Sequence, residues 1–258
     1  MVGTLKPKPE IAQLLNDEAR RINTPAFIAD DPVQFPRRFA SLPDIEIAAL
    51  LSSHIAWGNR RMICRDCERM LEIMDNQPQR YVLERGYEDL PDERNIHRTF
   101  FGRNFKHFLR GLHSIYSQHA SLADYVRTAG IAHGEHPSWQ LAQNLNALFA
   151  QANGGISDNR CLPQNLDNTA LKRLNMALRW LVRNDGIVDL GVWDVIKPSQ
   201  LYIPLDVHVG DTCRSLGITQ RRANDRRTVM EITSFLREIN PDDPILYDFA
   251  LFGIGMNL

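Results

Sequence analysis

Residues 169–183, TALKRLNMALRWLVR, carry the clearest helical pattern of the chain. Leucines recur in this stretch at spacings of three and four residues, which places them on one face of a helix. These leucines are Leu171, Leu174, Leu178 and Leu181. A second face is formed by Lys172, Asn175, Met176, Arg179 and Arg183. That face is too polar for a core, so it predicts either contact with solvent or the lining of a functional site.

A second informative stretch, IPLDVHV at residues 203–209, leads into a short helix. Val209, Cys213 and Leu216 give that helix an apolar stripe, and Asp206 stands where an N-cap belongs. A carboxylate held at a helix N-terminus stays ionised, because backbone N–H groups and the helix dipole favour its charged form. Asp206 can therefore be a plain cap, or an anion placed to face a developing positive charge.

The composition is that of an ordinary globular protein. The chain has 258 residues, 43% of them hydrophobic and 24% charged, with a formal net charge of −1. That length suits one large domain or two lobes. The net charge gives no strong basic footprint, although arginines gather locally. No apolar run could span a membrane, and the first ten residues lack a signal-peptide pattern, so we expect a cytoplasmic protein.

Helical periodicity dominates the rest of the chain, and strand signals are scarce, so the pattern predicts an all-α protein. The first clear element follows Ser41, a helix cap, and covers residues 45–57, which are apolar nearly all round. Further helices are expected from residue 60 to before Pro78, around Phe105–Ile115, and over 121–128, 139–151, 226–239 and 245–252. Residues 86–98 and 154–168 are expected to be loops.

Four segments, in order, resemble the helix-hairpin-helix (HhH-GPD) DNA glycosylase superfamily, which includes endonuclease III and the 8-oxoguanine glycosylases. They are IAALLSSHIAW (47–57), TALKRLNMALRW (169–180), IPLDVHV (203–209) and LYDFALFG (246–253). The resemblance implies a two-lobed helical fold. One lobe would contain residues 45–170, the other residues 1–44 with 171–258, and the site would lie in the cleft between them.

The same resemblance assigns roles to individual residues. Asp206 would be the essential carboxylate and Lys172 the nucleophile. The base pocket would be formed by Asp248, Phe252, His208 and Met176. Contacts to DNA would come from His54, Trp57, Arg60, Arg61, Arg173 and Arg179. The Lys172–Asp206 separation, 206 − 172 = 34 residues, resembles the longer spacing of archaeal 8-oxoguanine glycosylases.

The sequence also departs from that family. His54 stands where the family usually has glutamine, and the glycines of the family's hairpin are missing after Leu162-Pro163. That hairpin normally presents backbone N–H groups to a phosphate. Nearly the whole chain is also similar to an uncharacterised bacterial family, through SSHIAWGNR, KRLNMALRW, IPLDVHV and YDFALFG.

We therefore expect a base-excision DNA glycosylase with AP-lyase activity that removes a damaged, 8-oxoguanine-like purine from double-stranded DNA. RNA or a free nucleoside is an open alternative substrate, and we expect a monomer. A second hypothesis, favoured by the altered hairpin and the −1 charge, is a non-catalytic nucleic-acid-binding protein that retains the glycosylase core.

A metal-dependent hydrolase is a third and weaker hypothesis. His133 and His136 have a ligand-like spacing, but they lack carboxylates in a matching frame. The pair Cys64 and Cys67 falls within a helical pattern, with Cys67 on its apolar stripe. We therefore expect no metal and no cofactor.

Overall fold

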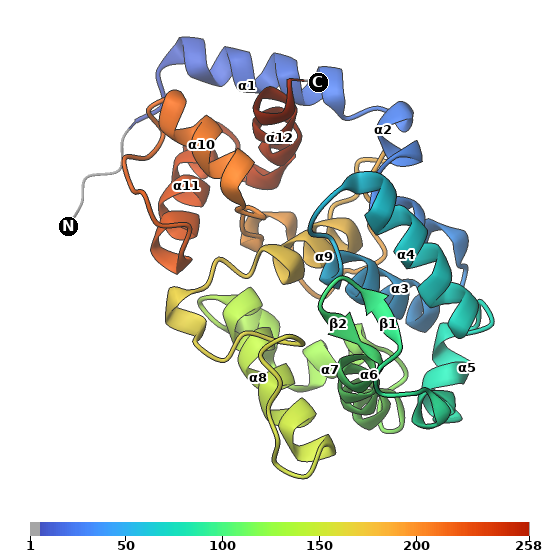
Figure 1. Cartoon of the computed structure of the whole chain (residues 1–258). Helices are drawn as coiled ribbons and strands as arrows, with labels where there is room; N and C mark the ends of the chain where they lie inside the picture. The colour runs from blue at the N-terminus through green and yellow to red at the C-terminus, as the bar shows by residue number, and fades with distance from the viewer. Residues whose placement is uncertain (1–5, 258) are drawn as a thin grey trace. The chain divides into compact units, whose positions relative to one another are not determined.

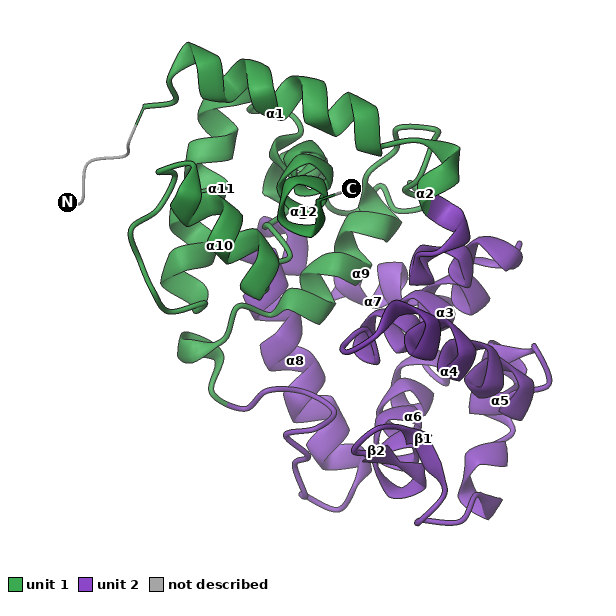
Figure 2. Cartoon of the chain, turned by 45° about the horizontal axis from the view of Figure 1, so that its top comes forward, with its two compact units in different colours: residues 1–27, 165–258 green, residues 28–164 purple. Residues whose placement is uncertain are grey.

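The computed structural model describes residues 6–257 (Figure 1). We expected no signal peptide in the first ten residues, and residues 1–5 of that stretch lie outside the described residues. The chain folds into two compact units (Figure 2). Unit 1 combines residues 1–27 with 165–258, and unit 2 is residues 28–164. Among the described residues, no helix has both the length and the apolar character to cross a membrane.

Helices make up most of both units, as predicted. Those of unit 1 are α1 (Pro9–Ile22), η5 (Leu166–Asn168), α9 (Lys172–Val182), η6 (Pro198–Gln200), α10 (Val207–Ser215), α11 (Arg226–Ile239), η7 (Pro244–Tyr247) and α12 (Asp248–Met256). Helix α2 (Pro25–Ala29) spans the boundary. Unit 2 contains η1 (Pro32–Gln34), η2 (Pro36–Arg38), α3 (Leu42–His54), α4 (Arg60–Ile73), α5 (Pro78–Leu83), η3 (Gly86–Asp89), β1 (Asn95–His97), β2 (Phe100–Phe101), α6 (Gly102–Tyr116), α7 (Leu122–Thr128), η4 (Ile131–His133) and α8 (Pro137–Ala152).

Helix α3 is the centre of unit 2. Ser41 caps it by accepting a hydrogen bond from Asp44 N at 3.3 Å, as the sequence predicts. Every residue from Ile45 to His54 is buried. The fully buried Glu46 accepts hydrogen bonds from Leu122 N (2.7 Å) and Ala123 N (2.9 Å). This carboxylate thereby satisfies the free N–H groups at the start of α7.

The structure differs from the expected secondary structure at the predicted loop 86–98 and before the first expected helix. Residues 86–98 are not all loop, because Asn95–His97 pairs antiparallel with Phe100–Phe101 in a short hairpin. The hairpin closes through Arg98, whose φ of 49° is left-handed. In addition, α1 precedes the first helix that we expected. Leu15, Ala19 and Ile22 form its buried stripe, a spacing of four and three residues that is visible in the sequence.

Helix α12 holds unit 1 together through close contact with α1 and α10, which lie beside it (Figure 1). A Cβ on Gly253 would lie 2.6 Å from Ile22 Cγ1, and a Cβ on Gly255 would lie 3.1 Å from the carbonyl oxygen of His208. Glycine at these two positions therefore lets the three helices approach one another closely.

Gly111→Ala tests how tightly α6 packs against α8. A Cβ at Gly111 would lie 2.0 Å from Phe149 Cδ1, and Phe149 is only 2% exposed, so its ring has no room to move away. Alanine favours a helix by about 1 kcal/mol over glycine, whereas overpacking a core costs about 1–3 kcal/mol. We expect a net loss of about 1–2 kcal/mol in the free energy of unfolding, measured in urea. A variant more stable than the wild type would contradict this packing.

Candidate active site

Helix α9 begins at Lys172, three residues later than the sequence predicts. Leu171 has a left-handed φ of 49°, so residues 169–171 cannot continue the helix backwards. Asn175 N nevertheless bonds to Leu171 O at 2.9 Å, which closes the first helical turn. Lys172 therefore stands at the N-terminus of α9, with 28% of its side chain exposed.

Asp206 is the N-cap of α10, as predicted. Its Oδ1 accepts a hydrogen bond from Val209 N at 3.0 Å, and its Oδ2 lies 3.7 Å from Lys172 Nζ. One oxygen thus fixes the carboxylate to the helix while the other faces the amine. Its side chain is 26% exposed. The structure therefore brings together Lys172 and Asp206, the two residues to which the HhH-GPD resemblance assigns chemical roles, and we call them the reactive pair.

The backbone of Asp206 is held by a segment that the sequence did not single out. Asn224 Nδ2 donates to Asp206 O at 3.1 Å, and Arg214 Nη1 donates to Asn224 Oδ1 at 3.3 Å and to Arg221 O at 3.0 Å. A Cβ at Gly210 would lie 2.6 Å from Asn224 Oδ1, so glycine leaves room for this contact. The loop before α11 thus fixes the start of α10.

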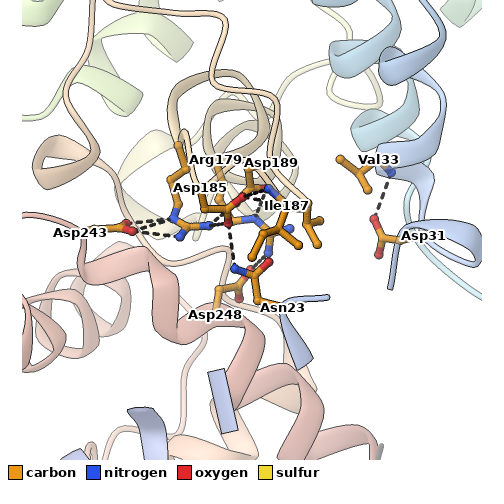
Figure 3. Close-up of polar contacts among 11 residues, drawn as sticks. Asn23, Asp31, Val33, Arg179, Asp185, Ile187, Asp189, Asp243 and Asp248 are labelled. Carbon is orange, nitrogen blue, oxygen red and sulfur yellow. Dashed lines mark hydrogen bonds and ion pairs between the residues drawn. The ribbon is translucent and has the colours of Figure 1, made fainter. Parts of the chain in front are cut away.

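Farther along α9, a cluster of ion pairs forms around Arg179 and Arg183, which belong to the polar face that also contains Lys172 (Figure 3). We call it the buried ion-pair cluster. Arg179 pairs with Asp248 and with Asp189, the latter at 3.2 Å. Arg183 pairs with Asp189 as well, and with Asp185 at 3.1 Å and Asp243 at 2.9 Å. Two arginines therefore meet four carboxylates. The polar face seen in the sequence is neither core nor solvated surface at these positions, because it lies against these carboxylates.

The carboxylates of this cluster have perturbed pKa values. Burial raises the pKa of Asp189 to about 6, although Arg179 and Arg183 oppose the shift. Burial also raises the pKa of Asp248, and Arg179 opposes this shift. The nearby charge of Asp206 raises the pKa of Asp248 further, whereas the charge of Lys172 lowers it. The reactive pair and the buried ion-pair cluster are therefore electrostatically connected through Asp248.

Two other residues expected in the base pocket are partly exposed. The Phe252 ring lies edge-on to Phe27, with centroids 6.2 Å apart, and the Phe252 and Met176 side chains are each partly exposed. His208 is exposed, and its carbonyl oxygen accepts a hydrogen bond from Thr212 Oγ1 at 2.9 Å. The structure does not bring the His208 side chain to the reactive pair by any contact among the described residues.

The residues expected to contact DNA are in different environments. Arg179 is 5% exposed and held by carboxylates, so its guanidinium is not available to a phosphate. Arg173 is partly buried, which lowers its pKa. In unit 2, His54 is 5% exposed and packs between Phe100 and Phe108, with ring centroids 4.9 and 5.0 Å away.

The remaining expected DNA contacts in unit 2 surround the start of α4. Trp57 is partly exposed and lies edge-on to His97, with centroids 4.5 Å apart. Arg60 Nη2 lies 3.4 Å from Asp31 Oδ2, and Arg61 is exposed. Sequence reasoning missed Asp185, Asp189 and Asn224, and it placed Arg183 on the polar face of residues 169–183 without a partner. That polar face indicates where Arg179 and Arg183 lie, but it does not identify the carboxylates that pair with them.

The histidines at 133 and 136 flank the start of α8. His133 ends η4, and His136 is the N-cap residue of α8, 3.8 Å from Glu135. Within residues 6–257, no three histidine, cysteine or acidic side chains gather as metal ligands would. Cys67 is buried on α4, as its apolar stripe predicts, and Cys64 is partly exposed.

The protein is thus mainly helical, and the amine of Lys172 and the carboxylate of Asp206 form a pair at the starts of α9 and α10. The chain belongs to a family of proteins of unknown function, DUF2400, whose model matches residues 31–257. The expected membership of an uncharacterised family is thereby confirmed. Comparison with curated proteins and with solved structures finds no match. The likeness to the HhH-GPD glycosylases stays a prediction.

Proposed function

We propose that this protein is a base-excision DNA glycosylase with AP-lyase activity, acting on a damaged purine of the 8-oxoguanine type. The observation that carries the proposal is the reactive pair: an amine and a carboxylate 3.7 Å apart, each about a quarter exposed, at the starts of α9 and α10. Sequence resemblance to the HhH-GPD superfamily assigns chemistry to these same two residues.

Base release builds positive charge on the sugar as the N-glycosidic bond breaks, and an enzyme reaches the nucleotide only after extruding it from the duplex. The ionised Asp206 would stabilise that charge, because its other oxygen is fixed by Val209 N and cannot turn away. The base leaves with the bonding electron pair and takes up the proton that Lys172 must lose before it can attack. Lys172, as a neutral amine, forms the new bond to the sugar carbon, and ring opening gives a Schiff base.

The buried ion-pair cluster supplies support for this site. Arg179, seven residues after Lys172 on the same face of α9, pairs with Asp248, and the charges of both Lys172 and Asp206 act on Asp248. We therefore assign Arg179 a positioning role in place of the DNA contact expected from the sequence. Asp248 is 5% exposed and paired with Arg179, so it would accept hydrogen bonds from the N–H edge of a guanine-type base only if the base displaced that pair.

Asp206→Asn tests the proposal. Asparagine caps a helix as well as aspartate does, so α10 keeps its start while the negative charge disappears. We expect single-turnover release of 8-oxoguanine from a duplex to fall by about 10²–10³-fold, the usual loss when one electrostatic contact to a transition state is removed. Base release is measured over a panel of lesion-bearing oligonucleotides.

The matched control is Asp211→Asn, which removes an acid from the same helix at a position 67% exposed and should keep the wild-type rate. A wild-type protein that binds the oligonucleotides but releases no base from any of them would refute the glycosylase. Such a result would favour the second candidate, a non-catalytic nucleic-acid-binding protein, which the missing glycines after Pro163 also favour.

A further inference from the structure

Several exposed arginines of this chain pair with a neighbouring carboxylate, whereas Arg98, Arg103 and Arg160 of unit 2, which lie around one hairpin, do not pair with any described one. Typical pairs are Arg38 with Glu68, Arg80 with Glu84, and Arg85 with Glu88. Among the described residues, no carboxylate oxygen lies within 4.0 Å of the guanidinium groups of Arg98, Arg103 and Arg160. All three are exposed. We call them the hairpin arginines.

The hairpin arginines gather around the turn between β1 and β2, which lies beside α4 and α6 (Figure 1). Arg98 forms the turn. Arg160 Nη1 donates to Thr99 O at 2.5 Å, and Arg103 lies over the Phe101 ring at 5.0 Å. The Arg98 side chain extends over Gly58, where a Cβ would lie 2.6 Å from its Nη1. Three segments of unit 2 thus bring positive charge to one edge.

Three carboxylates near the hairpin have partners of their own. Asp92 pairs with Lys106, and Asp158 accepts hydrogen bonds from Asn104 Nδ2 (2.7 Å) and Arg160 N (2.8 Å). Asp66 is 2% exposed and bonds to His97. Because these acids are engaged elsewhere, they leave the guanidinium groups of the hairpin arginines open to an external anion.

Buried contacts hold the hairpin in place. His97 is fully buried, with Nδ1 2.7 Å from Asp66 Oδ2 and Nε2 2.9 Å from Trp57 O. Arg69 also bonds to Ile96 O. Arg98 adopts a left-handed φ of 49°, although glycine or asparagine is usual there, and such a conformation costs an arginine about 1 kcal/mol. An arginine is thus held in the turn at an energetic cost.

We propose that the hairpin arginines bind the phosphodiester backbone of a nucleic acid, with Trp57 beside them as a ring on which an unpaired base can stack. Each exposed guanidinium has N–H donors left for phosphate oxygens, and arginine suits that geometry. The partly exposed Trp57 ring contacts His97 of the same hairpin. Aromatic rings beside arginines are typical of nucleic-acid surfaces and not of sites for small anions. The proposal extends the nucleic-acid partner of the proposed function, but it does not need the chemistry of Lys172.

The test is fluorescence anisotropy of the full chain with labelled DNA, as a duplex and as a single strand of equal length, from about 50 to about 300 mM salt. The triple variant Arg98→Gln, Arg103→Gln, Arg160→Gln should bind about 10–100-fold more weakly at low salt. The slope of its log affinity against log salt concentration should be smaller in magnitude by about 2–3, because each lost phosphate contact removes close to one released counterion. Both strand forms contain phosphodiesters, and a stronger effect on the single strand would mark stacking on Trp57.

The control is a second triple variant, Arg38→Gln, Arg80→Gln, Arg85→Gln, which removes the same charge from exposed, carboxylate-paired arginines of unit 2. We expect it to bind like the wild type. Equal loss in both triple variants, or wild-type binding by the hairpin variant, would overturn the proposal. DNA binding and base release are measured separately, so a protein that releases no base but loses affinity only in the hairpin variant would refute the glycosylase and leave the hairpin surface standing.

Discussion

Replacing Lys172 with alanine is expected to abolish the covalent adduct that borohydride traps between the protein and DNA carrying an abasic site or 8-oxoguanine. Borohydride reduces a Schiff base to a stable amine, so the trapped bond reports which amine attacked the sugar. Lys172 Nζ faces Asp206 Oδ2 and is partly exposed, so a sugar carbon can approach it. Alanine is a good helix former and should leave α9 intact.

The small number of lysines makes this experiment decisive. The chain has five of them: Lys6, Lys8, Lys106, Lys172 and Lys197. Mass spectrometry of the digested adduct can therefore assign the modified amine without ambiguity. Lys197→Ala is the matched control, because Lys197 is exposed in the same unit and should trap like the wild type. An adduct that persists in Lys172→Ala would exclude this residue as the nucleophile, and no adduct with the wild type would exclude the lyase step.

Replacing Arg179 with methionine should lower the free energy of unfolding by about 3–5 kcal/mol near pH 7, the usual cost of removing one partner from a buried ion pair. Asp189 is 2% and Asp248 5% exposed, and each loses a guanidinium contact in the variant. Methionine keeps the apolar volume of the side chain over the Phe249 ring, 4.4 Å from the guanidinium carbon in the wild type. The loss therefore reports charge and hydrogen bonding more than packing.

The pH dependence of this loss has a defined sign. Burial already raises the pKa of Asp189 to about 6 and raises that of Asp248, and removal of Arg179 takes away a charge that opposes both shifts. A carboxyl with a raised pKa binds more protons in the folded state than in the unfolded state, so its folded form gains stability as the pH falls. The difference between wild type and Arg179→Met should thus shrink between about pH 7 and about pH 5.

Urea denaturation at both pH values measures this difference. The control Arg227→Met removes an exposed cation from α11 and should change stability by no more than about 0.5 kcal/mol. The role given to the buried ion-pair cluster would be contradicted if Arg179→Met lost no more stability than Arg227→Met, or if its loss of stability were the same at both pH values.

Local patterns were enough to predict most helices and the cap at Asp206, whereas the pairing of Lys172 with Asp206 was expected only from the HhH-GPD resemblance. The cap at Ser41, the apolar α3 and the cap at Asp206 depend on residues within one or two turns, so sequence alone predicts them. The start of α9 was missed because a left-handed φ at a leucine has no sequence signal. The hairpin β1–β2 is too short to show an alternating pattern.

The contacts that define the rest of the site join residues far apart in the chain. Arg179 and Asp248 are separated by 69 positions, and Asn23 and Asp185 by 162. Periodicity can place a cation on a polar face, but it cannot name the carboxylate that comes to it from another helix. The hairpin arginines show the same limit, since Arg160 reaches Thr99 across 61 positions.

The close packing of α1 against α12 has a consequence for synthesis of the chain. Unit 1 takes its first helix from the beginning of the sequence and its last helix from the end, with the whole of unit 2 between them. On the ribosome, residues 28–164 can fold as soon as they emerge, whereas α1 must wait for α12. Closing so long a loop is slow, so unit 1, with its reactive pair, is the later part to assemble. A nascent chain would therefore acquire its hairpin arginines well before its reactive pair.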